Sequence, residues 1–334
     1  MKKNWPYLLF FVLLALVTSV LIFKDDFKSE DEKSFAITDT KEIYGFKIVD
    51  KMGNEVYLKK TENGWTINGF PAEKSLVVNV LETINKLQVN VPVSEDLRKK
   101  VIERLRNDSK KITFYNKDQE EIKSIHIAGS HIDMGNYMIL EKNGTVSPNP
   151  YIVQYPTFKG DLSYRFPIDS IAWKSTEVIA CKVDYIQKIE VKYFEKPEMS
   201  FTLDKDENAI KIRPNSKVII LEKPLNKEKI VNFLLPFEKL HFEAWILEDS
   251  VKNKIKSRPL YASVKLTDIE QGAQEILLYK IPVGDDYKIK DVAGKSLPFN
   301  VERFWGYIPK TKSYVLVQYY VFGPILREYA FFFE

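Results

Sequence analysis

The chain contains 334 residues, of which 45% are hydrophobic, 29% charged and 13% aromatic, a composition that argues against a disordered chain, a collagen-like chain and a polytopic membrane protein. The formal net charge of +4 is too small over so long a chain to indicate a basic binding surface, so a nucleic-acid partner is disfavoured. The single cysteine, Cys181, excludes an intramolecular disulfide, and its apolar context predicts a thiol buried in a strand.

An apolar segment lies at the start of the chain. Residues 5–23 carry no charged side chain, and a helix of this length spans about 28 Å, which matches one hydrocarbon core. The segment is longer than the apolar region of a cleaved signal peptide, and no small-residue cleavage site follows it. An uncleaved transmembrane helix is therefore predicted, with a buried core helix as the alternative.

The charges that flank this segment predict its orientation. Lys2 and Lys3 precede it, whereas the charges that follow it are mixed. Because cationic residues stay on the cytoplasmic side, residues 1–4 are predicted to be a cytoplasmic stub and the bulk of the chain to be extracytoplasmic. Residues 24–34 are charged without apolar periodicity, which predicts a tether. The sequence thus predicts a single-pass protein of the inner (plasma) membrane whose residues 5–23 contact lipid.

An internal repeat organises the rest of the chain. Residues 77–89 resemble residues 230–242 at an offset of 153. The identities are Val78/Val231, Asn79/Asn232, Leu81/Leu234, Lys86/Lys239 and Leu87/Leu240. In both segments the apolar residues recur at helical spacing, which predicts an amphipathic helix packed on a sheet.

Short alternating runs around both predicted helices predict strands. They are residues 46–49, 55–58, 65–67, 111–115, 121–127, 137–140 and 151–154, and then residues 189–191, 200–203, 210–212, 261–266, 275–279, 287–289 and 315–320. A second helix is predicted at residues 95–106 and again at 249–256. The pattern predicts an α+β fold of two repeated units, 35–178 and 179–334, each a mainly antiparallel sheet with helices on one face.

Several motifs of the first unit carry a family resemblance. They are Trp65-Thr66-Ile67-Asn68-Gly69, Lys86-Leu87-Gln88-Val89, Pro92-Val93, Gly135-Asn136-Tyr137-Met138-Ile139-Leu140-Glu141, Pro150-Tyr151-Ile152-Val153, Phe158-Lys159-Gly160-Asp161-Leu162, Arg165-Phe166 and Trp173-Lys174-Ser175. Together they resemble a bacterial family of single-pass membrane proteins catalogued as a domain of unknown function, best over residues 35–180. The resemblance implies an inner-membrane anchor, a repeated α+β ectodomain and an association with ABC-type export and gliding machinery, and it assigns no catalytic residue.

Polar residues that chemistry might use are few. His126, His131 and Asp133 form the one compact group, but a metal site takes three or four ligands in a fixed geometry, so loop or surface positions are the favoured interpretation. Paired carboxylates suited to acid–base chemistry lie in charged turns, at Glu120–Glu121 and Asp285–Asp286. No catalytic, cofactor-binding or metal-ligating residue is predicted, and no cofactor.

Aromatic residues are dense between Phe299 and Phe333. Strand propensity explains most of them as sheet edge and tail packing, and the alternative is an exposed patch that docks a partner or the bilayer. The leading hypothesis is a noncatalytic, membrane-anchored extracytoplasmic interaction protein, an accessory component of a membrane transport or motility assembly. A ligand-binding ectodomain for glycan or peptide, with a cleft between the units, is the second hypothesis, and a hydrolase is the third.

Overall fold

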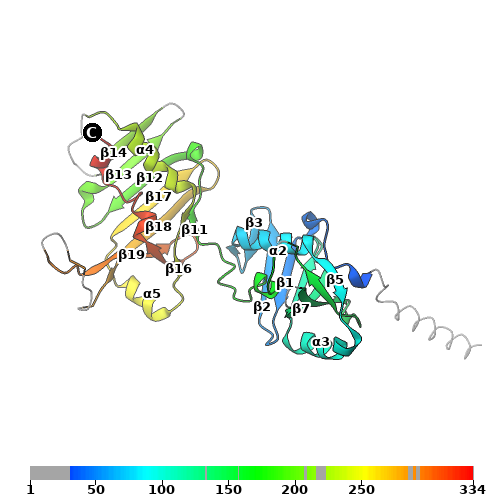
Figure 1. Cartoon of the computed structure of the whole chain (residues 1–334). Coiled ribbons are helices and arrows are strands. Elements are labelled where there is room, and N and C mark those ends of the chain that lie inside the picture. The colour runs from blue at the N-terminus through cyan, green and yellow to red at the C-terminus, as the bar shows by residue number, and fades with distance from the viewer. Residues whose placement is uncertain are drawn as a thin grey trace, which may run out of the picture. The chain divides into compact units, whose positions relative to one another are not determined.

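The computed structural model describes residues 31–131, 134–156, 158–206, 209–215, 223–284, 289–290 and 294–333 (Figure 1). The chain divides into two compact units, Met1–Ser175 and Thr176–Glu334, close to the predicted boundary after residue 178. The predicted stub at residues 1–4 and the predicted span at residues 5–23 lie outside the described residues. Within the described ranges, no helix is both long enough and apolar enough to cross a membrane.

The first unit begins with residues that the sequence assigns to the tether. Asp31–Lys33 form a 3-10 helix, η1, in which Glu32 is buried. The Glu32 carboxylate accepts hydrogen bonds from Ser147 Oγ at 3.3 Å and from Asn149 Nδ2 at 2.8 Å. A buried carboxylate needs such donors to offset its lost hydration. The prediction of a tether over residues 24–34 is therefore wrong for Asp31–Lys33, which belong to the folded unit.

Lys123, on β7 (Glu121–His131), holds the chain that follows η1. Its Nζ donates to the carbonyl oxygens of Ser34 and, at 2.7 Å, of Ala36. Phe35, between these two residues, is buried in the core of the unit. Burial disfavours the charged ammonium and lowers the pKa of Lys123 to about 8.

We expect the Lys123→Met variant to lose a pH dependence of stability that the wild type has. The folded pKa of about 8 lies below the model-compound value of 10.5. Between these values the unfolded chain binds more protons, so the free energy of unfolding of the wild type rises with pH. Chemical denaturation of both proteins at several values from about pH 8 to about pH 10 measures this rise. If the difference in free energy of unfolding between wild type and variant stayed constant over that range, burial would not lower the pKa of Lys123.

The first unit is built on one antiparallel sheet. Its strands are β1 (Gly45–Val49), β2 (Glu55–Thr61), β3 (Gly64–Ile67), β4 (Phe70–Pro71), β5 (Gln88–Pro92), β6 (Lys110–Tyr115), β7, β8 (Gly135–Lys142), β9 (Thr145–Val146) and β10 (Tyr151–Gln154). Its helices after η1 are η2 (Thr40–Glu42), α2 (Lys74–Lys86), α3 (Glu95–Asp108) and η3 (Leu162–Arg165). The strand order is β4-β3-β2-β1-β6-β7-β8-β10-β5, and β9 pairs with β8.

Helix α2 covers one face of this sheet. Val77, Val80 and Ile84 recur at helical spacing and are buried in the same core as Phe46 and Trp173. The amphipathic helix predicted from residue 77 is confirmed over this part. It ends at Lys86, however, and the predicted last turn instead leads into strand β5.

The prediction that the helices cover one face is wrong for the first unit. Val101 and Leu105 of α3 pack in a separate cluster with Ile139 of β8, whereas Met138 and Leu140, its neighbours on that strand, belong to the core under α2. Successive side chains of a strand point to opposite faces. Helices α2 and α3 therefore lie on opposite faces of the sheet.

The second unit is also built on an antiparallel main sheet, with a separate two-stranded sheet. Its strands are β11 (Glu177–Ile179), β12 (Ile186–Tyr193), β13 (Phe201–Lys205), β14 (Ile210–Pro214), β15 (Leu240–His241), β16 (Ala244–Trp245), β17 (Ala262–Asp268), β18 (Gly272–Pro282), β19 (Phe299–Ile308) and β20 (Ser313–Gln318). Its helices are η4 (Val183–Tyr185), η5 (Pro197–Met199), α4 (Lys227–Leu234), η6 (Leu235–Glu238), α5 (Asp249–Lys256), α6 (Tyr319–Phe322) and η7 (Tyr329–Phe332). The order of the main sheet is β14-β13-β12-β17-β18-β19-β20-β16, and β11 pairs with β15.

The strand orders of the two units follow one scheme. In the main sheets, β1 to β3 and β12 to β14 lie in reverse chain order at one side, with β4 outside β3 in the first unit. The next four strands, β6, β7, β8 and β10 or β17 to β20, follow in chain order. A strand from between the two helices, β5 or β16, then pairs with the last of these four at the far edge. The predicted α+β class with mainly antiparallel sheets is confirmed.

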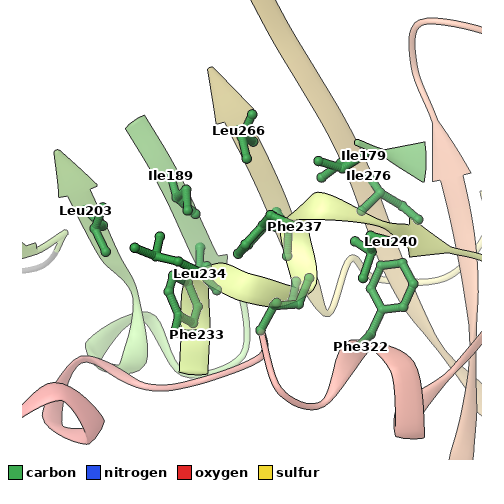
Figure 2. Close-up of a cluster of buried hydrophobic side chains, with 14 of the residues drawn as sticks. Ile179, Ile189, Leu203, Phe233, Leu234, Phe237, Leu240, Leu266, Ile276 and Phe322 are labelled. Carbon is green, nitrogen blue, oxygen red and sulfur yellow. The ribbon is translucent and has the colours of Figure 1, made fainter. Parts of the chain in front are cut away.

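The core of the second unit lies between the sheet and the segment that contains α4 and η6. Figure 2 shows Leu234 and Phe237 directed toward Ile189, Leu203 and Leu266, which come from three adjacent strands, β12, β13 and β17. All five side chains are at most 3% exposed. This burial supplies the main stabilisation of the unit, because apolar area removed from water is the dominant favourable term in folding.

Two predicted elements of the second unit have different bounds. The helix predicted over residues 230–242 ends at Leu234 as α4, because Pro236 has no N–H to continue the helical ladder. The strand predicted at residues 287–289 falls largely outside the described residues. The strand that pairs with both β18 and β20 is β19. The strand predicted over residues 315–320 ends at Gln318, since α6 begins at the next residue.

Candidate functional site

A groove lies at one end of the sheet in the second unit, where β12 and β18 end and β17 and β19 begin. Its inner part is a cavity of about 380 Å³. The cavity is lined by five aromatic residues and by three charged ones: Tyr193, Tyr261, Phe299, Phe304, Tyr319, Glu195, Lys196 and Lys280. A volume of this size lies in the range of small-ligand sites, which combine apolar walls with a few polar groups.

A wider hollow of about 540 Å³ adjoins this cavity. Val301 and Tyr319 line both hollows. Glu302, Arg303, Gln318 and Tyr320 also line the outer one. We call the two hollows together the aromatic groove.

The rings of the inner part are fixed by contact with one another. Tyr261 and Phe304 stack nearly parallel, with centroids 5.4 Å apart and planes 6° apart. Tyr193 meets Tyr261 edge-on at 5.9 Å, and Tyr319 lies 6.1 Å from Phe304. Burial raises the pKa of both Tyr193 and Tyr261, so these phenols stay neutral. The aromatic wall of the inner cavity is therefore preformed, and its rings are uncharged.

Lys280 brings a cation to this aromatic wall. Its Nζ lies 4.7 Å from the centroid of Tyr261 and 4.4 Å from that of Phe299. The same atom forms an ion pair with Glu195 Oε2 at 2.5 Å. Ring faces attract a nearby ammonium, and the carboxylate adds a charge-assisted hydrogen bond. The side chain is therefore held across the inner cavity, where it presents a donor beside the acceptor oxygens of Glu195.

A second ion pair lies at the outer hollow. Arg303 donates from Nε to Glu243 Oε2 at 2.8 Å and from Nη2 to Oε1 at 3.1 Å. This bidentate contact lowers the pKa of the Glu243 carboxyl. Tyr319 and Tyr320 stand beside it, 46% and 89% exposed. The outer hollow thus combines a fixed guanidinium with open aromatic surface.

The dense aromatic residues near the C-terminus divide between two environments. Phe322 and Phe332 are fully buried in the core of the second unit, which confirms the predicted tail packing. Tyr319 and Tyr320 are exposed at the aromatic groove. Docking of a partner at such a patch stays a prediction. No local sequence pattern marks Glu195 or Lys280, because these two residues converge from distant parts of the chain.

The histidine group of the first unit is not brought together. His126 Nε2 lies 2.6 Å from Glu141 Oε2, and its Nδ1 lies 3.2 Å from Ser109 Oγ. Lys111 Nζ reaches the other oxygen of Glu141 at 2.5 Å. Burial opposes ionisation of Glu141, but the hydrogen bonds from Lys111 and His126 outweigh it and lower the pKa of this carboxyl. The network joins β6, β7 and β8, and its carboxylate is already paired on both oxygens.

The other predicted positions that the structure describes are separate from this network. His131 lines a hollow of its own with Tyr155 and Phe158, and Asp133 lies outside the described residues. Among the residues that the structure describes, no group of three or more His, Cys, Asp or Glu side chains could hold a metal ion. The acidic pair Glu120–Glu121 lies at a turn, where a Glu120 carboxylate oxygen accepts from Asn116 at 2.9 Å. Asp285–Asp286 lies outside the described residues.

Cys181 is buried, as predicted, but it follows β11 and is not part of a strand. Its Sγ donates to the carbonyl oxygen of Lys182 at 3.3 Å. Burial raises the pKa of the thiol to about 11, so the reactive thiolate is scarce at neutral pH. The thiol is a packing group of the core.

Comparison of the chain with protein-family models, with curated proteins and with solved structures found no match.

Proposed function

We propose that the chain is a noncatalytic, membrane-anchored interaction protein whose two α+β units lie outside the inner membrane. The apolar residues 5–23 and the cations that precede them support the anchor and its orientation, with residues 1–4 in the cytoplasm. Because Asp31 already belongs to the folded unit, the link to the anchor is proposed to lie within residues 24–30. Fully extended, this link reaches about 25 Å, which keeps the first unit near the membrane.

The two units are proposed to be copies of one ancestral unit. Their main sheets follow the same strand scheme. Helices α2 and α4 begin at Lys74 and Lys227, at the offset of 153 that aligns the two sequences. The equivalent Val78 and Val231 are both exposed, by 50% and 52%. A strand order of this length rarely recurs by chance within one chain, which favours duplication.

The aromatic groove is the observation that carries the proposed interaction. Tyr319 and Tyr320 leave large apolar surface exposed beside a preformed cavity, and exposed aromatic patches commonly mark binding sites. On the family resemblance, we place the protein as an accessory component of a membrane transport or motility assembly. A ligand-binding ectodomain for glycan or peptide is the second candidate, and the inner cavity of the second unit favours it.

A photo-crosslinking experiment tests the proposal. The photoreactive residue p-benzoylphenylalanine replaces Tyr320 in the full-length chain, which is expressed in its native membrane and irradiated. We expect a heavier adduct from this position. We expect none when the same residue replaces Tyr164, which is 81% exposed in η3 of the first unit. Recovery of the chain in the soluble fraction, or no adduct at position 320, would contradict the proposal.

A further inference from the structure

The aromatic groove carries an inference about the chemistry of its ligand. We propose that it binds a linear chain of neutral sugars, an inference that rests on the proposed function because it names what the anchored protein holds. The proposal depends on the shape of the groove, the state of its backbone groups, and the balance of donors, acceptors and charge along it.

The shape of the groove favours a linear ligand. The inner cavity and the outer hollow share Val301 and Tyr319, so a chain that enters one part continues into the other. Tyr319 packs against Phe304 but keeps 46% of its surface exposed. It therefore offers exposed aromatic surface at the junction. A sugar ring has apolar C–H faces that fit such a platform, whereas its rim is polar.

The backbone around the groove disfavours an extended peptide. A peptide that adds to a sheet needs an open strand edge. Here β19 pairs with β18 on one side and, from Arg303 onward, with β20 on the other. The main chain of Tyr261 is also occupied, because its N–H donates to the carbonyl of Leu278 and its carbonyl accepts from the N–H of Phe194. Recognition in the groove must come mainly from side chains.

The side chains of the groove need a ligand that both donates and accepts hydrogen bonds. Glu195 and Glu302 offer acceptor oxygens, whereas Lys280 and Arg303 offer donors. A hydroxyl group does both, so each sugar can interact with either member of these pairs. A proline-rich peptide, the other ligand suited to aromatic grooves, lacks backbone N–H donors at its prolines, so it adds no hydrogen bond to the carboxylate oxygens beyond those from Lys280 and Arg303.

The charge of the groove indicates a neutral chain. Its charged lining residues are two carboxylates and three cations: Glu195, Glu302, Lys196, Lys280 and Arg303. Arg303 is in turn neutralised by Glu243. Because these charges nearly balance, the groove has no excess charge to attract a polyanion or a polycation. Either ligand would leave charged lining residues of its own sign without a partner.

Binding of defined oligosaccharides tests the inference. Full-length protein in phosphatidylcholine nanodiscs, free of glycosidic detergent, is titrated calorimetrically with cellohexaose, chitohexaose, maltohexaose and a decaproline peptide. We expect saturable binding of at least one hexasaccharide and none of decaproline. Binding of decaproline, or of none of the three hexasaccharides, would overturn the inference.

Matched variants assign the binding to the groove. Tyr319→Ala should weaken hexasaccharide binding about tenfold, which corresponds to about 1.4 kcal/mol, because it removes a central aromatic contact. Tyr164→Ala should leave binding unchanged, since that exposed tyrosine lies in the first unit. Equal binding by wild type and Tyr319→Ala, with the same thermal melt, would place the sugar elsewhere and overturn the assignment.

The crosslink at position 320 separates this inference from the proposed function. An adduct that contains carbohydrate supports both. An adduct that contains only protein supports an interaction protein and overturns the glycan ligand. No adduct at all contradicts both.

Discussion

The Gly135→Ala variant is expected to lose about 3 kcal/mol or more of its free energy of unfolding. Gly135 begins β8 with φ +125, a conformation that side-chain-bearing residues rarely adopt. A Cβ built there lies 2.4 Å from the carbonyl oxygen of Val153 and 2.9 Å from its carbonyl carbon. Val153 belongs to β10, which pairs with β8, so the clash is relieved only by distorting the sheet.

Gly144→Ala is the matched control for this variant. Gly144 has φ +80, but a Cβ there meets no atom within 4 Å. The control therefore isolates the conformational penalty, about 1 kcal/mol. Guanidinium denaturation of the full-length proteins, followed by tryptophan fluorescence, measures both changes. Similar losses in the two variants would show that the sheet accommodates the extra methyl group.

Trp173→Ala is expected to cost about 3–5 kcal/mol, the range for truncating a buried large aromatic side chain. Trp173 is fully buried. Its ring meets Phe46 at 5.5 Å in an edge-on contact, and its Nε1 donates to the carbonyl oxygen of Pro167 at 2.7 Å. Truncation leaves a cavity and removes the donor from a half-buried carbonyl. The large loss follows from the sum of the two.

Trp173→Phe separates these two contributions, because it retains an aromatic ring and removes the indole N–H. Its loss should lie between that of Trp173→Ala and that of Tyr164→Ala, an exposed position where the change should stay within about 0.5 kcal/mol. The same denaturation assay compares all three. If Trp173→Ala lost less than about 1 kcal/mol, the segment around it would have to move easily out of the core.

Alternating side chains predict the strands of this protein well where one face is polar. The run at residues 55–58 alternates as expected, with Val56 and Leu58 buried and Glu55 exposed. β19 lacks this signal, because Phe304, Trp305 and Gly306 are buried in succession and a register shift near Lys280 interrupts its pairing with β18. Its aromatic residues were predicted as an edge and a tail, although the strand lies inside the sheet.

The sequence of β8 and β10 does indicate that a helix such as α3 covers the second face of the sheet. Met138-Ile139-Leu140 and Tyr151-Ile152-Val153 are apolar without interruption, and these residues are buried. Such runs are typical of strands covered on both faces. They indicate that a helix must pack on each side of β8 and β10, as α2 and α3 do.

The aromatic groove could not be predicted from the sequence alone. Its residues come from distant parts of the chain. Tyr193 ends β12, Tyr261 directly precedes β17, Lys280 lies near the end of β18 and Tyr319 begins α6. Only the sheet order brings them together. Propensity locates each strand but does not fix its neighbours. The Glu195–Lys280 pair shows the same limit, because an ion pair between distant loops and strands leaves no periodic pattern.

The edge strands β5 and β16 have a consequence for biosynthesis. Each is translated well before the strand that pairs with it, since β5 waits for β10 and β16 waits for β20. Neither sheet is complete until β10 or β20, respectively, has left the ribosome. Contacts so far apart in sequence form slowly, and an unpaired edge invites aggregation meanwhile. The first unit can close while the second is still emerging, which limits the exposed edge of a nascent chain to one unit at a time.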